Sequence, residues 1–160
     1  MQDIRSQLIS FFDQCAARLN QAVADDPVID IDATADAFAE SFVEVSPVSI
    51  PSRRNGEHFR EMIPRGFAFY HGIGTRSVSI WSRDFMQIDD LHWMAKIHWQ
   101  VCCEPDGLAS EVIDFDIFYF IQMADGMPKI FAYITGDEQR ALRNQGLTPE
   151  IYEVWDTAVA

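Results

Sequence analysis

Residues 91–103 read LHWMAKIHWQVCC, and the alternation of apolar and polar side chains along them decides the fold. One alternate set is apolar and the other is mostly polar or charged: Trp93, Ala95, Ile97, Trp99 and Val101 against His92, Met94, Lys96, His98 and Gln100. A period of two residues is that of a β-strand with one buried face. We therefore expect a strand here, in a sheet that keeps one face dry.

Three more segments with strand character surround this one. They lie at residues 76–88, 111–123 and 129–135. Turn-forming residues separate the four segments: Asp89-Asp90, a loop at Pro105-Asp106-Gly107, and Asp125-Gly126. Short connections between consecutive strands favour an antiparallel meander.

Ahead of residue 75, apolar residues recur at steps of three and four, which is the period of helices. Residues 2–24 predict a long amphipathic helix. Asp30 or Asp32 can cap a second helix, which carries Phe38 and Phe42 on one side and stops at Pro47.

The remaining segments are shorter. We expect a short strand at residues 48–50 and a third helix at 56–72, which Pro64 should kink. Behind the last strand, residues 137–143 predict a short helix ended by Gly146, and Thr148 with Pro149 opens another.

The composition limits what the chain can bind. Among its 160 residues, 25 are acidic and 12 are basic, which gives a formal net charge of −13. Such a charge repels phosphate backbones and anionic lipid heads, so we expect neither nucleic acid nor a membrane as a partner. The length fits one domain over residues 1–160.

Cysteine usage and motif content set further limits. The chain has three cysteines, an odd number, and Cys102 and Cys103 would point to opposite faces of a strand. This pattern argues against a disulfide framework and favours a reducing compartment, so we expect a cytoplasmic protein. The longest purely apolar run, residues 117–121, is far shorter than the roughly 20 residues that cross a bilayer. The sequence contains no metal or nucleotide motif, and we expect no cofactor and no metal site.

The order of elements resembles the nuclear transport factor two-like superfamily, which includes SnoaL-like proteins and ketosteroid isomerase. The resemblance also rests on the helical stretch GEHFR at residues 56–60 and on the closing hairpin DGMPKIFAYITGD at residues 125–137. It implies an α+β cone: three N-terminal helices packed on a curved antiparallel sheet of four to six strands around a central pocket, with short C-terminal helices behind it.

The catalytic patterns of enzymes in this superfamily are not reproduced here residue by residue. Where ketosteroid isomerase needs a tyrosine in its first helix, this chain has Phe11 and Phe12, and residues 44–50 contain no aspartate. At the arginine and aspartate positions of limonene epoxide hydrolase, the nearest residues are lysine, histidine and threonine. Scytalone dehydratase shares only residue types with this chain. The resemblance therefore implies a pocket and leaves the reaction open.

Two faces of the sheet could line this pocket. With a two-residue turn at Asp89-Asp90, the polar face would bring His98 together with four charged residues and Trp81; the four are Arg83, Lys96, Asp114 and Asp116. A histidine held by a carboxylate can act as a general base. The same set also suits a convex face that is solvated or meets a second subunit.

If the apolar face lines the pocket, the candidates change. The assumed register places Asp84 opposite Ala95, among Trp93 and Trp99, where loss of hydration would favour its protonated form and suit it as a base. The competing interpretation places Asp84 at the rim of the sheet, paired with an arginine.

We therefore expect a pocket for a small apolar or aromatic molecule, and the enzyme that such a pocket would suit is a cofactor-free lyase, isomerase or hydrolase. The catalytic candidates are Asp84, His98 and Tyr133, and the ligand contacts are expected to be Tyr70, Trp93, Trp99, Tyr119 and Thr135. The alternative is a noncatalytic ligand-binding or dimerisation module. Aromatic residues on both faces of residues 111–123 favour a homodimer through the sheet.

Overall fold

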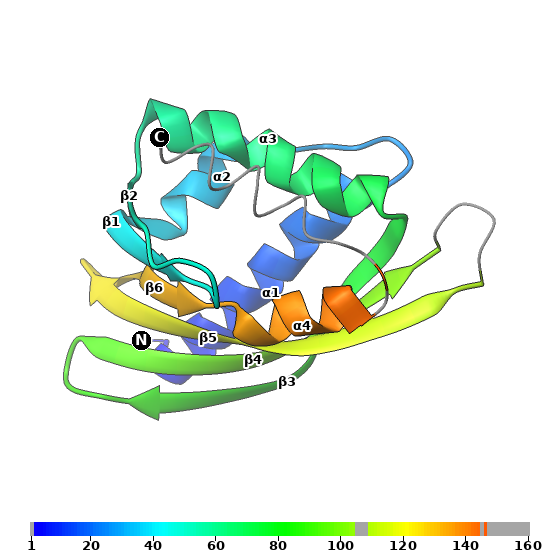
Figure 1. The fold of residues 1–160 in the computed structure, drawn as a ribbon. Coiled ribbons are helices and arrows are strands. Elements are labelled where there is room, and N and C mark those ends of the chain that lie inside the picture. Colours follow the sequence, from blue (N-terminus) through cyan, green and yellow to red (C-terminus); the bar gives the residue numbers. More distant parts are fainter. Residues whose placement is uncertain (1, 105–108, 145, 147–160) are drawn as a thin grey trace.

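The computed structural model describes residues 2–104, 109–144 and 146, and Figure 1 shows how its elements are arranged. The strands are β1 (Phe38–Val45), β2 (Ser52–Arg54), β3 (Thr75–Gln87), β4 (His92–Cys103), β5 (Glu111–Ala124) and β6 (Met127–Ile134). The helices are α1 (Ile4–Val23), α2 (Ile31–Asp36), α3 (Glu57–Gly72) and α4 (Gly136–Asn144). In Figure 1, α1 lies between the curved sheet and α3.

The six strands form one sheet in the order β2-β1-β6-β5-β4-β3. The four long strands β3 to β6 are antiparallel neighbours, as the sequence predicts. β1 pairs with β6 in the parallel sense, so the sheet is mixed and the prediction of a purely antiparallel sheet is wrong for this pair. The overall architecture is the predicted α+β cone.

The predicted second helix is wrong beyond its first turns. α2 ends at Asp36, and the residues that follow form β1 instead of continuing the helix. Phe38 and Phe42 both pack inward, because residues four apart lie on the same face of a strand, and the pairing of β1 with β6 shifts between Phe38 and Val43. A four-residue apolar spacing is therefore not specific to a helix. The strand expected at residues 48–50 lies instead at Ser52–Arg54.

The third helix and the first C-terminal helix are confirmed as α3 and α4. Pro64 lies inside α3, as expected. Leu142 of α4 is buried with 1% of its surface exposed, which anchors α4 to the main core. The helix predicted to open at Thr148 lies outside the described residues.

The core occupies the inner face of the sheet, the face that α1 and α3 cover. Leu8 and Phe12 of α1 are fully buried there against Ala95 and Ile97 of β4. Asn20 fixes α1 to β3, because its side chain accepts a hydrogen bond from the Val78 amide (2.8 Å) and donates one to the Val78 carbonyl (2.7 Å). β3 is an edge strand, so these bonds satisfy backbone groups that would otherwise be exposed.

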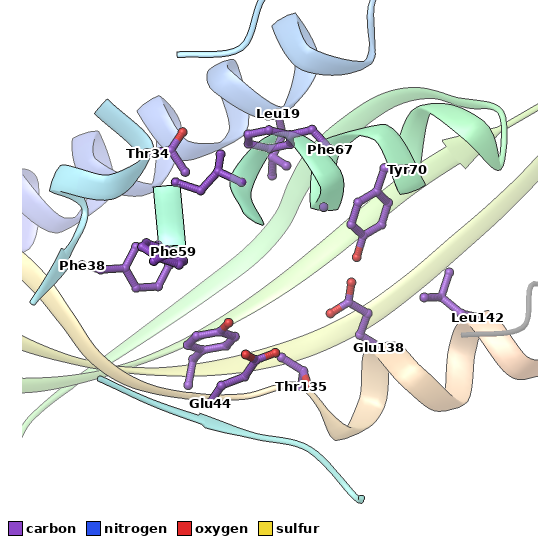
Figure 2. A pocket seen from close by; sticks show the side chains of 13 residues that line it. Leu19, Thr34, Phe38, Glu44, Phe59, Phe67, Tyr70, Thr135, Glu138 and Leu142 are labelled. Carbon is purple, nitrogen blue, oxygen red and sulfur yellow. The ribbon is translucent and has the colours of Figure 1, made fainter. Parts of the chain in front are cut away.

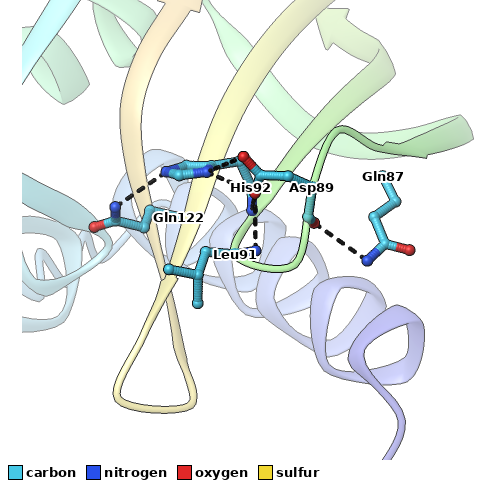
Figure 3. A network of polar contacts seen from close by, with 5 residues as sticks. All are labelled: Gln87, Asp89, Leu91, His92 and Gln122. Atoms are coloured by element: carbon cyan, nitrogen blue, oxygen red, sulfur yellow. Dashed lines mark hydrogen bonds and ion pairs between the residues drawn. The ribbon is translucent and has the colours of Figure 1, made fainter.

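The turn between β3 and β4 differs from the predicted two-residue turn. The Asp89 carboxylate accepts hydrogen bonds from the amides of Leu91 (2.9 Å) and His92 (2.8 Å), and it contacts the His92 ring at 2.7 Å (Figure 3). The other ring nitrogen of His92 lies 3.1 Å from the Gln122 amide nitrogen, which connects the turn to β5. An aspartate that bonds amides two and three residues ahead holds a longer turn.

This longer turn moves the register of the adjoining part of β3, residues 82–87, by one residue, and a bulge at Trp81 restores the predicted register from Ile80 toward the start of the strand. Ser82 lies opposite His98 and Asp84 opposite Lys96, whereas the predicted register placed Trp81 and Arg83 there. Since side chains alternate between faces, the shift moves Asp84 from the inner face to the outer face.

Among the described residues, no helix has the length and apolar character required to cross a membrane.

Candidate functional site

A cavity with two adjoining lobes lies between the inner face of the sheet and helices α1, α3 and α4. The lobes have volumes of about 190 Å³ and 200 Å³. They share six lining residues: Leu19, Phe38, Tyr70, Tyr133, Thr135 and Glu138. Figure 2 shows the lobe beneath α3 with its lining side chains. Together the lobes have room for a small organic molecule.

Aromatic rings form most of the walls. Phe38, Phe59 and Phe67 line the lobe beneath α3, and Trp99 and Tyr119 line the lobe against the sheet. The Trp99 indole nitrogen donates a hydrogen bond to the Tyr119 hydroxyl at 3.0 Å. Burial raises the pKa of the Tyr119 hydroxyl, so it stays neutral and keeps its proton.

An ion pair closes one side of the cavity. The Arg53 guanidinium of β2 lies 2.7 Å from the Glu44 carboxylate of β1, and the two side chains are 8% and 12% exposed. Away from water, such a pair depends on both partners, because either charge alone would be strongly disfavoured. Glu44 is also hydrogen-bonded to the Tyr133 hydroxyl. Burial, and then the charge of Glu44, raise the pKa of Tyr133 well above its ordinary value.

A second carboxyl group faces the cavity from α4. In Figure 2 the carboxyl of Glu138 and the hydroxyl of Tyr70 point toward each other, from α4 and α3. Burial, and then repulsion from Glu44, raise the pKa of Glu138 from 4.5 to about 8. At neutral pH most Glu138 side chains are therefore protonated, while Glu44 has a guanidinium to balance its charge.

Five of the predicted ligand-binding or catalytic residues line this cavity. They are Tyr70, Trp99, Tyr119, Tyr133 and Thr135. Trp93 packs against the core on the inner face, but it is absent from the described lining of either lobe. The apolar face of β4 is thus the inner one, as one of the two predicted arrangements required.

The other two catalytic candidates lie on the outer face, the side of the sheet that carries Lys96 and His98. Asp84 is exposed there opposite Lys96, because of the register shift, and cannot reach the cavity. His98 lies between two carboxylates: its Nδ1 is 2.8 Å from Asp116 and its Nε2 is 3.0 Å from Asp114. The predicted cluster thus forms in part: Lys96 also lies 3.9 Å from Asp116, whereas Arg83 lies opposite Ile97 and pairs with Asp13 of α1 instead. The hydrogen bond that the His98 ring makes to Asp116 is the main cause that raises the pKa of His98.

Three charged residues of the site were not predicted from the sequence: Glu44, Arg53 and Glu138. The predicted second helix included Glu44. The only sequence signal for its true position is that it lies two residues after the apolar Phe42, which would put both side chains on the inner face of a strand. The position of Arg53 at the site results from the pairing of β2 with β1, which places Arg53 opposite Phe42. No sequence signal separates Glu138 from the other acidic residues near it.

In the part of the chain that the structure describes, no group of three or more histidine, cysteine, aspartate or glutamate side chains is arranged to hold a metal ion. The carboxyl and hydroxyl groups that line the cavity offer proton transfer and hydrogen bonding.

Comparisons with known proteins extend the picture of the fold. No protein-family model matches the sequence, and no curated protein matches it. Among solved structures, the β subunit of benzoate 1,2-dioxygenase from Burkholderia mallei has a TM-score of 0.60 at 15% identity, covering 84% of this chain and 89% of that chain.

Two further structures are similar to the same degree. A proposed scytalone dehydratase from Novosphingobium aromaticivorans has a TM-score of 0.59 at 10% identity, covering 80% of this chain and 79% of the other. An NTF2-like protein from Cytophaga hutchinsonii has a TM-score of 0.58 at 11% identity, covering 83% of this chain and 97% of the other. At these identities the likeness concerns the fold, and this chain has the NTF2-like, or SnoaL-like, cone fold.

Proposed function

We propose that this protein binds a small apolar or aromatic molecule in the cavity and transfers a proton on it, as a cofactor-free isomerase, lyase or hydrolase. The observation that carries the proposal is the pair of carboxyl groups in one largely aromatic cavity. Glu44 is balanced by Arg53 at 2.7 Å, and the pKa of Glu138 is raised to about 8 by burial. Two carboxyl groups whose surroundings separate their protonation states are the arrangement that acid–base enzymes use.

Glu138 is the proposed proton-transfer group. A general acid or base works best when its pKa lies near the working pH, and a value of about 8 meets that condition. Glu44 and Arg53 are proposed as positioning residues, because they hold the Tyr133 hydroxyl and set the charge that Glu138 meets. Tyr70 and Thr135 are proposed ligand contacts at the same lobe.

The proposal is tested by a proton exchange assay that needs no knowledge of the natural substrate. Aryl ketones that fit the cavity are incubated with the protein in deuterated buffer, and exchange at the carbon next to the carbonyl is followed by NMR. We expect the wild type to accelerate the exchange and Glu138→Gln to abolish the acceleration. Glu40→Gln is the matched control, because Glu40 has a side chain that is 86% exposed and lies outside the cavity.

The outcomes separate the two functional classes. Ketones that bind without accelerated exchange would support the alternative, a noncatalytic ligand-binding protein. Acceleration that survives Glu138→Gln would contradict the role of Glu138. Mass spectrometry of molecules retained after gentle purification adds an independent check for a bound guest.

We also propose that the outer face joins two copies of this chain. Its apolar side chains include Met86 and Ile134, which are 52% and 37% exposed, and Phe118 and Phe120 lie between them on β5. Apolar side chains gathered on one exposed sheet face favour association. The three free cysteines support the proposed cytoplasmic compartment.

Light scattering after gel filtration tests the dimer. We expect the mass of two chains for the wild type and of one chain for Met86→Glu combined with Met94→Glu. Val28→Glu is the control, because Val28 is 59% exposed in a loop away from the sheet. A wild type that stays monomeric at tens of micromolar concentration would contradict the proposal.

A further inference from the structure

The charged side chains that line the cavity have one sign. Among the described residues that line its two lobes, Glu44 and Glu138 are the charged ones, and both are acids. Arg53 pairs with Glu44 at 2.7 Å but is not among the described residues that line either lobe. An anionic ligand would therefore meet two carboxyl groups in surroundings where charge interactions are strong.

The aromatic walls suit a cation. The rings of Phe38 and Tyr133 lie 5.9 Å apart, and those of Tyr119 and Tyr133 lie 6.2 Å apart with an angle of 25° between their planes. All three line the cavity. A cation within about 6 Å of a ring face is attracted to it, and the attraction grows when the site excludes water. The net charge of −13 also raises the local concentration of cations around the protein.

From these observations we infer that the cavity binds an organic monocation, an amine with an aromatic or apolar body, whose ammonium group pairs with Glu138 while its body packs among the rings. This inference deepens the proposed function and rests on it, since it names the class of small molecule. The Glu44–Arg53 pair remains intact in the complex, so that one carboxyl group is left to balance one ammonium charge.

Binding of an amine must then release a proton. In the empty cavity Glu138 is mostly protonated at neutral pH, and its carboxyl must ionise to pair with ammonium. The groups that face it are Glu44 from β1, Tyr70 from α3, Tyr119 from β5 and Tyr133 from β6. The phenols of Tyr119 and Tyr133 remain neutral in this range.

The affinity for the amine should therefore rise with pH. The expected change is about tenfold for each pH unit below the Glu138 pKa of about 8. Affinity should level off above that value and fall only when the amine itself loses its proton, near pH 10. A quaternary ammonium ligand should show the rise without the later fall.

The experiment compares three probes of nearly the same shape: 2-phenylethylamine, 2-phenylethanol and phenylacetate. Calorimetry near pH 6.5 in two buffers of different ionisation enthalpy gives the affinities and the protons released. We expect the amine to bind at least about tenfold more tightly than the alcohol and to release about one proton. Phenylacetate should bind most weakly.

Variants assign the effect to Glu138. Glu138→Gln should bring amine and alcohol to similar affinities and remove the proton release, while alcohol binding shows that the cavity is intact. Glu40→Gln should behave as the wild type. Should Glu138→Gln fail to fold, benzyltrimethylammonium titrated into the wild type across pH provides the same proton count.

Each outcome decides a different claim. Alcohol binding as tight as amine binding, or amine binding without proton release, would overturn the inference and leave the proposed small-molecule function standing. Failure of all three probes to bind would overturn the proposed small-molecule function together with the inference.

Discussion

Removing the guanidinium of Arg53 should destabilise the protein far more than removing that of its neighbour Arg54. Arg53 and Glu44 are 8% and 12% exposed and lie 2.7 Å apart, so Arg53→Met leaves a carboxylate in the interior without its partner. Breaking a buried pair in this way costs about 3–5 kcal/mol of unfolding free energy. Arg54 lies 3.9 Å from Glu40 with both side chains more than four-fifths exposed, and Arg54→Met should cost less than about 1 kcal/mol.

Urea unfolding followed by circular dichroism measures both costs. Glu44→Gln combined with Arg53→Met should recover most of the loss, because the amide oxygen still accepts a hydrogen bond from Tyr133 and no charge remains buried. The deficit of Arg53→Met should also shrink as pH falls, since a buried carboxyl without a cation takes up a proton more readily. Equal losses for Arg53→Met and Arg54→Met would refute the reasoning.

Three further predictions concern stability. The two aspartate contacts raise the pKa of His98, so they stabilise the folded state at pH values below the ordinary histidine pKa of 6.5, and this contribution is lost as pH rises through the folded-state pKa. The unfolding free energies of the wild type and His98→Gln should therefore converge at alkaline pH. A constant difference between them from pH 5 to 9 would contradict this. Tyr119→Phe removes the acceptor of the buried Trp99 indole and should cost about 1–3 kcal/mol in urea unfolding, with unchanged stability as the contrary result. Asn20→Ala leaves the amide and the carbonyl of Val78 without their side-chain partner and should speed amide hydrogen exchange at the start of β3. Unchanged exchange there would show that this edge strand does not depend on the Asn20 hydrogen bonds.

The strands after residue 75 could be predicted because a sheet with one dry face imposes a period of two. β4 begins within one residue of its predicted start and ends at the predicted Cys103. β1 could not be predicted in this way, because the spacing of four between Phe38 and Phe42 fits a helix and one face of a strand alike, and because its pairing with β6 is irregular between Phe38 and Val43. Local spacing alone does not reveal a bulge that depends on the neighbouring strand.

The walls of the site were easier to predict than its charges. Trp99, Tyr119 and Tyr133 follow from the dry face of the sheet, which the alternation identifies. The prediction for Asp84 is wrong because the turn at Asp89 is longer than two residues, and the resulting one-residue slip exchanges the two faces of the strand as far as the bulge at Trp81. Glu44 and Glu138 come together only in three dimensions, because β1 and α4 are far apart in the sequence.

The protonation of Glu138 in the empty cavity tests the account most directly. An NMR pH titration of its side-chain carboxyl carbon, assigned by comparison with Glu138→Gln, should give a midpoint of about 8. Addition of 2-phenylethylamine should move that midpoint downward, toward the value of an ordinary carboxyl group. A midpoint near 4.5 in the protein without ligand would contradict a water-poor cavity with a carboxyl group poised to exchange its proton.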